Sequence, residues 1–226
     1  LSRDEDVLIA LGSRNQRLSR FWFNDQSDAE PHPELAGKHV VVLDGEDDFV
    51  TMFRHVLRVL GMTSETVRHH DYATGDFGRA DLVVVGPGPG DPRELGDPKI
   101  KAVRAAVDDL LASGQPFLAV CLGHQVLAGA LGLPLTYKDI VFQGTQTKVS
   151  VLGRRENVGF YNTFVARPEV GAAPSAGVTL DLDPVTRDVN ALAGPHFRGV
   201  QFHAESILTE HGFDLIRELL LDLLRA

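Results

Sequence analysis

The sequence predicts an α/β protein with a mainly parallel, open β-sheet, helices on both faces and a C-terminal half rich in β-strands. Two observations carry this prediction. From Lys38 onward, short apolar runs of strand length alternate with segments of helical periodicity, which is typical of βαβ units and a parallel sheet. After Pro134 the helical periodicity stops, and short apolar segments follow one another until a last amphipathic segment.

The expected elements of the first half begin with a buried strand at 39–43, an acidic turn and a helix that ends at Leu60. Gly61 follows, and a glycine just after the last periodic residue is a common helix stop. Further strands are expected at 63–67, 80–85 and 117–120, and further helices at 99–111 and 123–131. In the second half we expect strands at 146–151, 157–165, 178–182 and 199–202, and a closing helix at 209–224.

Length, charge and cysteine content limit the class of protein. The 226 residues suffice for one α/β domain, or for one domain with an appended segment. A net charge of −9 without a basic stripe argues against nucleic acid as a partner. The apolar runs fall short of the roughly 18 residues that a membrane span needs, and no secretion leader is recognisable. A single cysteine rules out an internal disulfide and fits a reducing compartment, so we expect a cytoplasmic protein.

Residues 1–36 differ in composition from the rest of the chain. A polar, basic stretch precedes the aromatic cluster Phe21-Trp22-Phe23, and an acidic, proline-bearing stretch at 24–33 has the character of a linker. Two interpretations remain open: an extension that folds onto its own domain, or the tail of an upstream domain. We assign 1–36 to the linker or tail and 37–226 to the folded domain.

The most specific chemical signal surrounds Cys121. An apolar strand runs into the cysteine and a helix begins at once, which is the layout of a nucleophile elbow. The sharp turn needs small neighbours, and Ala119 and Gly123 are small. A cysteine at a helix N-terminus faces the positive end of the helix dipole, which favours the thiolate. Read alone, the pattern also fits a buried core cysteine.

A second signal lies near the C-terminus, at the end of an expected strand. His203 and Glu205 are two residues apart, so in an extended segment both side chains point the same way. A base oriented by a carboxylate is what a nucleophilic thiol requires. Read alone, the pair also fits a surface His-x-Glu.

The third signal is the glycine–proline loop at 86–92, which directly follows the expected strand at 80–85. Ligand sites of open α/β sheets lie beyond the carboxyl ends of the strands. No Gly-Lys-Ser/Thr follows, so this is not a phosphate loop. Its stiff prolines and bare glycine amides suit an oxyanion hole, or else a rigid surface turn. Cys121-x-x-His124 has the spacing of half a zinc site, but no second ligand pair follows, and we expect no metal.

Taken together and in this order, the three motifs resemble class I glutamine amidotransferases. They are the Gly-Pro-Gly loop, the Val-Cys-Leu-Gly-His-Gln elbow and the Gln-Phe-His-x-Glu segment, and the resemblance covers about residues 38–226. It implies a flavodoxin-like α/β fold. It also implies a glutaminase that hydrolyses L-glutamine to glutamate and ammonia through a cysteine thioester.

The resemblance assigns roles to the matching positions. It implies that Cys121 is the nucleophile, that His203 is the general base and then the acid, and that Glu205 orients His203. The oxyanion hole falls on two backbone amides, those of Gly88 and Leu122. The residues implied to bind the glutamine substrate are Gly86, Gln125, Thr163 and Phe164.

Within this class, the sequence is most similar to amidotransferases of chorismate-using synthases. These are anthranilate synthase, aminodeoxychorismate synthase and the phenazine-pathway 2-amino-2-desoxyisochorismate synthase. Residues 11–23 resemble the join between the two halves of single-chain members, and 142–144 and 160–164 are similar to the phenazine type. The resemblance implies that the partner is a chorismate-binding synthase domain or subunit. It places Mg²⁺ only in that synthase and no cofactor in this domain, and it is compatible with a homodimer of the full-length enzyme.

Three positions depart from the usual residues of the family. Ala119 replaces Gly before the nucleophile, Asn162 replaces His, and Gln143-Gly144-Thr145 replaces a His-Gly-Lys segment that contacts the synthase. The last change leaves open which synthase, and therefore which amino product, the domain serves. Two other functions also remain open: a catalytically inactive regulatory or scaffolding domain, and a related cysteine hydrolase of γ-glutamyl peptides. The complete Cys-His-Glu set favours an enzyme, and Gln125 favours the amidotransferase.

Overall fold

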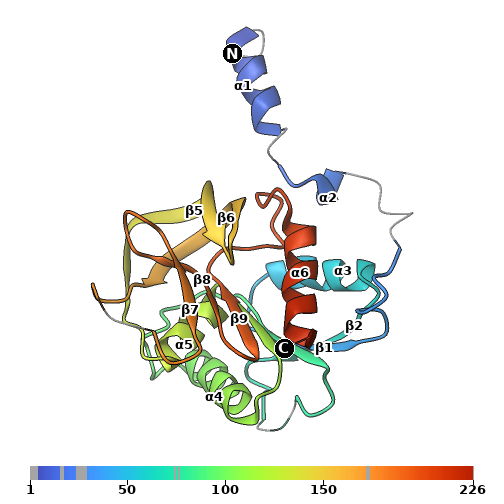
Figure 1. The fold of residues 1–226 in the computed structure, drawn as a ribbon, viewed down its shortest axis with the longest axis vertical. Coiled ribbons are helices and arrows are strands. Elements are labelled where there is room, and N and C mark those ends of the chain that lie inside the picture. The colour runs from blue at the N-terminus through green and yellow to red at the C-terminus, as the bar shows by residue number, and fades with distance from the viewer. Residues whose placement is uncertain are drawn as a thin grey trace.

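The computed structural model describes residues 5–15, 18–23, 30–73, 75, 77–171 and 174–225. A seven-stranded sheet crosses the molecule in the order β2-β1-β3-β4-β9-β8-β7 (Figure 1). The neighbouring parallel strands are β2 (Thr63–Arg68), β1 (His39–Asp44), β3 (Leu82–Val85), β4 (Phe117–Val120) and β9 (Phe197–Val200). The antiparallel strands β8 (Val189–Ala193) and β7 (Thr179–Leu182) extend the sheet beyond β9.

Helices cover both faces of this sheet. One face packs against α3 (Phe49–Val59) and α6 (Gly212–Arg225), and the other against α4 (Pro98–Ser113) and α5 (Leu122–Ala130). Residues of β1 divide alternately between the two cores, because successive side chains of a strand point to opposite faces. A strand buried on both faces therefore reads as one continuous apolar run, as the four residues of β3 do.

A separate two-stranded antiparallel hairpin joins β5 (Leu135–Val151) to β6 (Arg154–Ala166). Its pairing shifts register between Tyr137 and Phe142 and again between Gln143 and Thr145. An isolated bridge between Gly159 and His203 ties β6 to the segment that follows β9. The hairpin is thereby held beside the carboxyl ends of the parallel strands.

The predicted fold class is confirmed, with three differences in detail. The strand β8 was not predicted, because Asn190 interrupts its apolar run. The strand expected at 199–202 lies at 197–200, since the chain bends at Gln201. The strand expected at 146–151 is the end of the much longer β5. Many side chains in the first half of β5 are exposed, so its sequence lacks the apolar alternation of a half-buried strand.

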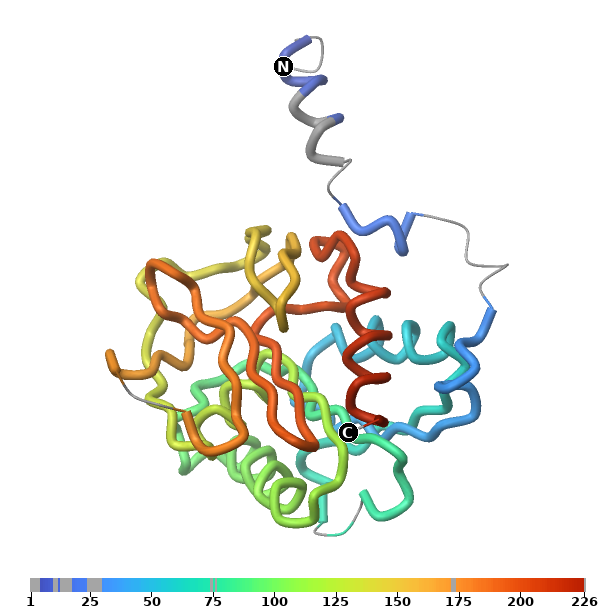
Figure 2. The backbone as a smooth tube through the Cα atoms, in the orientation of Figure 1, coloured from blue at the N-terminus to red at the C-terminus, as the bar shows by residue number. Residues whose placement is uncertain are grey.

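The described part of the N-terminal segment includes α1 (Glu5–Asn15) and α2 (Arg20–Phe23). α1 projects from the rest of the molecule, whereas residues 18–23 lie next to the start of α6 (Figure 2). The ring of Phe21 stacks on Phe213 at 4.6 Å, and Trp22 lies 5.6 Å from the ring of His55 in α3. Two of the three clustered aromatics thus pack on the domain itself, while Phe23 is exposed. The proposed boundary at 36/37 stays a prediction.

None of the helices in the described ranges is long and apolar enough to cross a membrane.

Candidate active site

Cys121 lies at the turn between β4 and α5. Its backbone has φ 51° and ψ −102°, a strained conformation for a residue other than glycine. Its amide donates to the carbonyl of Val200 at 2.9 Å, which ties the turn to β9. A Cβ on Gly123 would lie 2.4 Å from the carbonyl oxygen of Val85, so only glycine lets α5 approach β3 this closely. The structure therefore has the geometry of the predicted elbow.

His203 and Glu205 form a buried pair just beyond β9. The Nδ1 atom of His203 is 2.8 Å from Oε1 of Glu205, and the two side chains are 1% and 0% exposed. The segment is not extended as the sequence predicted, because it bends after β9. Its backbone is held instead by the amide of His203 donating to Gly159 and by the hydroxyl of Thr209 donating to the His203 carbonyl.

The surroundings of His203 favour its charged form. Burial by itself lowers the pKa of His203, but the charges of Cys121 and Glu205, and hydrogen bonds with both, raise it well above its usual value. The ring is packed between Phe49 at 4.4 Å and Tyr161 at 5.1 Å. An imidazolium held beside the Cys121 sulfur stabilises a thiolate there.

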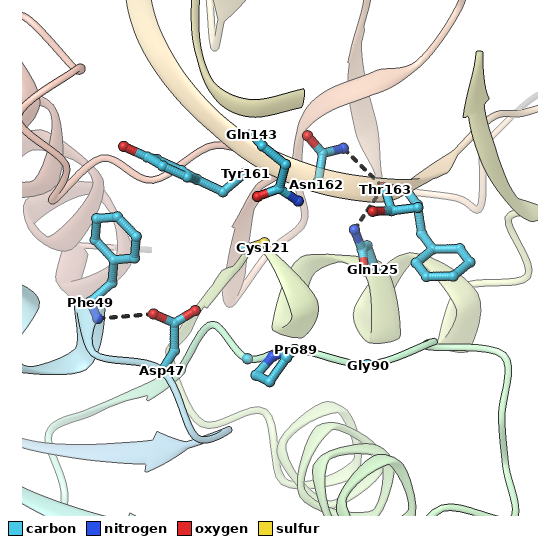
Figure 3. Close-up of a pocket in the computed structure, with 12 residues that line it drawn as sticks. Asp47, Phe49, Pro89, Gly90, Cys121, Gln125, Gln143, Tyr161, Asn162 and Thr163 are labelled. Carbon is cyan, nitrogen blue, oxygen red and sulfur yellow. Dashed lines mark hydrogen bonds between the residues drawn. The ribbon is translucent and has the colours of Figure 1, made fainter. Parts of the chain in front are cut away.

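A cavity of about 350 Å³ opens above Cys121 (Figure 3). It lies between the loops at the carboxyl ends of β1 and β3, the start of α5 and the β5–β6 hairpin. The lining residues are Asp47, Phe49, Gly88, Pro89, Gly90, Cys121, Gln125, Gln143, Tyr161, Asn162, Thr163 and Phe164. In Figure 3 the side-chain amide of Gln143 points into the cavity, toward Cys121.

The cavity brings together five of the nine residues that the sequence singled out. These are Cys121, Gly88, Gln125, Thr163 and Phe164. Gly86 does not line it, because this residue ends β3 and its amide donates to the carbonyl of Leu43. Leu122 is the first residue of α5, so its amide has no acceptor within the helix.

Gln125 joins α5 to β6. Its Nε2 atom donates to the carbonyl of Phe164 at 2.7 Å and to Oε1 of Gln201 at 3.1 Å. Nδ2 of Asn162 donates to the same carbonyl at 2.9 Å, as Figure 3 shows. The segment 162–164 is therefore fixed against the helix that begins at Cys121.

Sequence reasoning missed Asp47, Phe49 and Gln201. The first two follow β1, and the rule that ligands gather beyond the carboxyl ends of parallel strands would have included them. Gln201 stood inside a recognised motif but had no role, because its partners are 76 and 80 residues away.

His124 does not belong to the site. It is completely buried, and its Nε2 atom is 3.2 Å from the carbonyl oxygen of Val189. Burial lowers the pKa of His124 to about 4. Among the described residues, no group of three or more His, Cys, Asp or Glu side chains is arranged to hold a metal ion.

Comparison with known proteins gives one family. The family model "Glutamine amidotransferase class-I" matches residues 41–223. The chain is 42% identical over 218 residues to the protein named "Anthranilate synthase, phenazine specific" of Pseudomonas chlororaphis, covering 95% of this chain and 34% of that protein. It is 32% identical to anthranilate synthase component II of Haloarcula marismortui, covering 78% of this chain and 94% of that protein. The chain thus spans about a third of the length of the phenazine-specific relatives.

Two solved structures share the fold at low identity. A putative GMP synthase protein from Thermoplasma acidophilum superposes with a TM-score of 0.69 at 20% identity, covering 83% of this chain and 94% of that one. A glutamine amidotransferase from Thermotoga maritima gives a TM-score of 0.63 at 17% identity, covering 75% and 76%.

Proposed function

The chain belongs to the class I glutamine amidotransferases, and we propose that it hydrolyses L-glutamine to glutamate and ammonia through a thioester on Cys121. The observation that carries the proposal is the position of Cys121. This residue is the only cysteine, it occupies a strained elbow that opens into a cavity, and the buried His203–Glu205 pair lies next to it. A cavity of about 350 Å³ is near the lower end of ligand pockets, about 300–1,000 Å³, and suits a single amino acid.

In the first step, the Cys121 sulfur attacks the side-chain carbonyl carbon of glutamine. A carbon–sulfur bond forms, and the carbonyl oxygen takes up negative charge. The amides of Gly88 and Leu122 are the proposed donors to this oxygen, since both belong to the turns that border the cavity. His203 then gives a proton to the leaving nitrogen, and the carbon–nitrogen bond breaks to release ammonia.

In the second step, water attacks the thioester. His203, now neutral, accepts a proton from that water, the carbon–sulfur bond breaks, and glutamate leaves. Glu205 fixes which ring nitrogen of His203 faces the reaction, because its Oε1 atom holds Nδ1. The sum is glutamine plus water giving glutamate plus ammonia.

The hydrogen bonds of Gln125 limit how it meets the substrate. Both hydrogens on its Nε2 atom are already donated, to Phe164 and to Gln201. Its carbonyl oxygen is therefore the group left to accept a hydrogen bond from glutamine. Thr163 and Phe164, on the opposite wall, are the other proposed contacts.

Release of glutamate from L-glutamine tests the proposal, with γ-glutamyl dipeptides as the alternative substrate. We expect turnover of glutamine and little or none of the dipeptides. Preference for the dipeptides would make the protein a γ-glutamyl hydrolase. Failure to turn over either, also when joined to a synthase, would make it an inactive scaffolding domain.

We further propose that the ammonia passes to a chorismate-using synthase, to which residues 1–36 lead. The similarity to a phenazine-specific anthranilate synthase three times as long supports this. We expect slow hydrolysis by the isolated chain and faster hydrolysis when the chain is joined to a synthase half that holds chorismate. One oxyanion donor that is misplaced without the partner would account for a factor of about 10²–10³. Equal rates with and without the synthase, and with and without chorismate, would rule the coupling out.

The domain itself is proposed to need no metal. Treatment with EDTA should leave glutamate release by the isolated chain unchanged, whereas synthesis by the joined enzyme should stop because Mg²⁺ is expected in the synthase half. Loss of glutamate release by the isolated chain on EDTA treatment would contradict this.

A further inference from the structure

Gln201 occupies the position next to Cys121 on the neighbouring strand. Val120 of β4 pairs with Val200 of β9, so Cys121 and Gln201 are the next residues beyond this pair on two parallel strands. Gln201 is 1% exposed and is not among the residues that line the cavity. Its backbone amide donates to the carbonyl of Asn190 at 2.9 Å. The residue is therefore fixed behind the nucleophile and does not reach the substrate.

The side chain of Gln201 connects the sulfur to the substrate pocket. Its Nε2 atom is 3.9 Å from the Sγ atom of Cys121, within the range of a hydrogen bond to sulfur. Its Oε1 atom accepts from Nε2 of Gln125, which in turn donates to the carbonyl of Phe164. A row of hydrogen bonds thus runs from the hairpin wall of the cavity to the sulfur.

This row fixes the orientation of the Gln201 amide. A backbone carbonyl only accepts hydrogen bonds, so the Gln125 nitrogen must face Phe164. That same nitrogen faces Oε1 of Gln201, and the NH₂ group of Gln201 is then the part turned toward the sulfur. A donor held in this way favours a charged sulfur over a neutral one.

We propose that Gln201 is a positioning residue that donates to the Cys121 sulfur from outside the cavity, favours its thiolate and couples it to Gln125. The catalytic consequence rests on the proposed glutaminase function, while the effect on the thiolate does not. Other ionisable groups also face the sulfur or its cavity: His203 with its partner Glu205, Asp47 and Tyr161. The test must therefore isolate the contribution of Gln201.

The test is the pH dependence of alkylation by iodoacetamide in wild type, Gln201→Met and Gln146→Met. Alkylation reports on the thiolate of Cys121 alone, because the chain has no other cysteine. Gln201→Met keeps the length of the side chain and removes the donor. The control, Gln146→Met, removes a donor to the carbonyl of Leu208, near the same loop but not to the sulfur.

We expect the profile of Gln201→Met to move up by about one pH unit, so that alkylation at pH 7 slows about tenfold. Gln146→Met should keep the wild-type profile. Glutamate release by Gln201→Met should also slow about tenfold at neutral pH and recover partly as the pH rises. A profile for Gln201→Met that matches wild type would overturn the proposal.

A measurement on the wild type covers the case in which Gln201→Met does not fold. The side-chain amide signals of Gln201 in ¹⁵N-labelled protein should shift as Cys121 titrates, and this shift should be lost in Cys121→Ser. Signals that ignore the titration would overturn the proposal. A wild type that releases no glutamate would sink only the glutaminase function, because alkylation and the amide shifts do not depend on turnover.

Discussion

The cavity has two walls of different construction. One is made by the ends of β4 and β9, where every strand residue is buried and Cys121, Gln201 and His203 are held by backbone hydrogen bonds. The other is the β5–β6 hairpin, where register shifts surround Gln143, and Ile140 is 72% exposed. The groups proposed to do chemistry lie on the first wall. Two of the three departures from the usual residues of the family lie on the second.

The difference indicates a division of labour. Residues on the sheet wall touch buried neighbours on every side, so a change there disturbs both stability and the positions of reacting atoms. Residues on the hairpin wall face solvent or the cavity, and a change there alters contacts with substrate or partner at little cost in stability. Substitutions on the two walls should therefore differ both in size and in kind.

The largest expected effect is on the sheet wall, at His203. His203→Ala removes the proposed base and acid, and glutamate release should fall by about 10²–10⁴-fold or more, the usual contribution of general acid–base catalysis. Glu205→Gln should lose less, since that residue only orients His203. Steady-state kinetics with thermal unfolding as a control would measure both. A near-normal rate in His203→Ala, together with a lost rate in His124→Ala, would show that the base is misassigned.

Two glycine substitutions compare the walls directly. Gly123→Ala places a methyl group 2.4 Å from the carbonyl of Val85, and such overpacking typically costs about 1–3 kcal/mol. It should also displace the elbow and reduce turnover strongly. Gly144→Ala on the hairpin has φ +74° and only Tyr161 and Leu208 nearby, so the cost is the left-handed backbone, about 1–2 kcal/mol, with turnover little changed. Urea unfolding and kinetics of both variants check this, and an equal loss of turnover in both would remove the distinction.

His124 should reveal its burial through pH. Its folded pKa of about 4 is lower than the usual value of 6.5, so the unfolded chain binds a proton more readily than the folded one. The stability that this residue contributes is complete above about pH 6.5 and is lost as the pH falls toward 4. Between pH 7 and 5 the free energy of unfolding should drop by about 2 kcal/mol more in the wild type than in His124→Gln. Parallel curves for the two proteins would contradict the assignment.

The smallest effect is expected on the hairpin wall. Gln143→Ala removes an exposed side chain that points into the cavity, and surface changes of this kind usually alter stability by less than about 0.5 kcal/mol. We expect kcat to stay within about threefold of the wild type and KM to change more than kcat, because the residue borders the substrate and not the sulfur's supports. A loss of kcat as large as that of His203→Ala would place Gln143 with the catalytic groups and end the comparison.

The sequence revealed the sheet wall better than the hairpin wall, and the reason is physical. Strand, turn and helix around Cys121 are local patterns, so apolar runs and Gly123 were enough to predict the elbow. The length of β5 was missed because exposed strands lack alternation, and β8 was missed because Asn190 breaks its apolar run. The contacts of Gln201 depend on residues far away in the chain, which no local pattern records.

The most direct test of Cys121 as the nucleophile is labelling by a glutamine-shaped diazoketone, read by mass spectrometry. Because Cys121 is the only cysteine, a thiol adduct has one place to form. We predict one adduct per chain on the peptide that contains Cys121, slowed by excess L-glutamine, and none in Cys121→Ala. A wild type that stays unlabelled, or a Cys121→Ala variant that releases glutamate at the wild-type rate, would contradict the proposed chemistry.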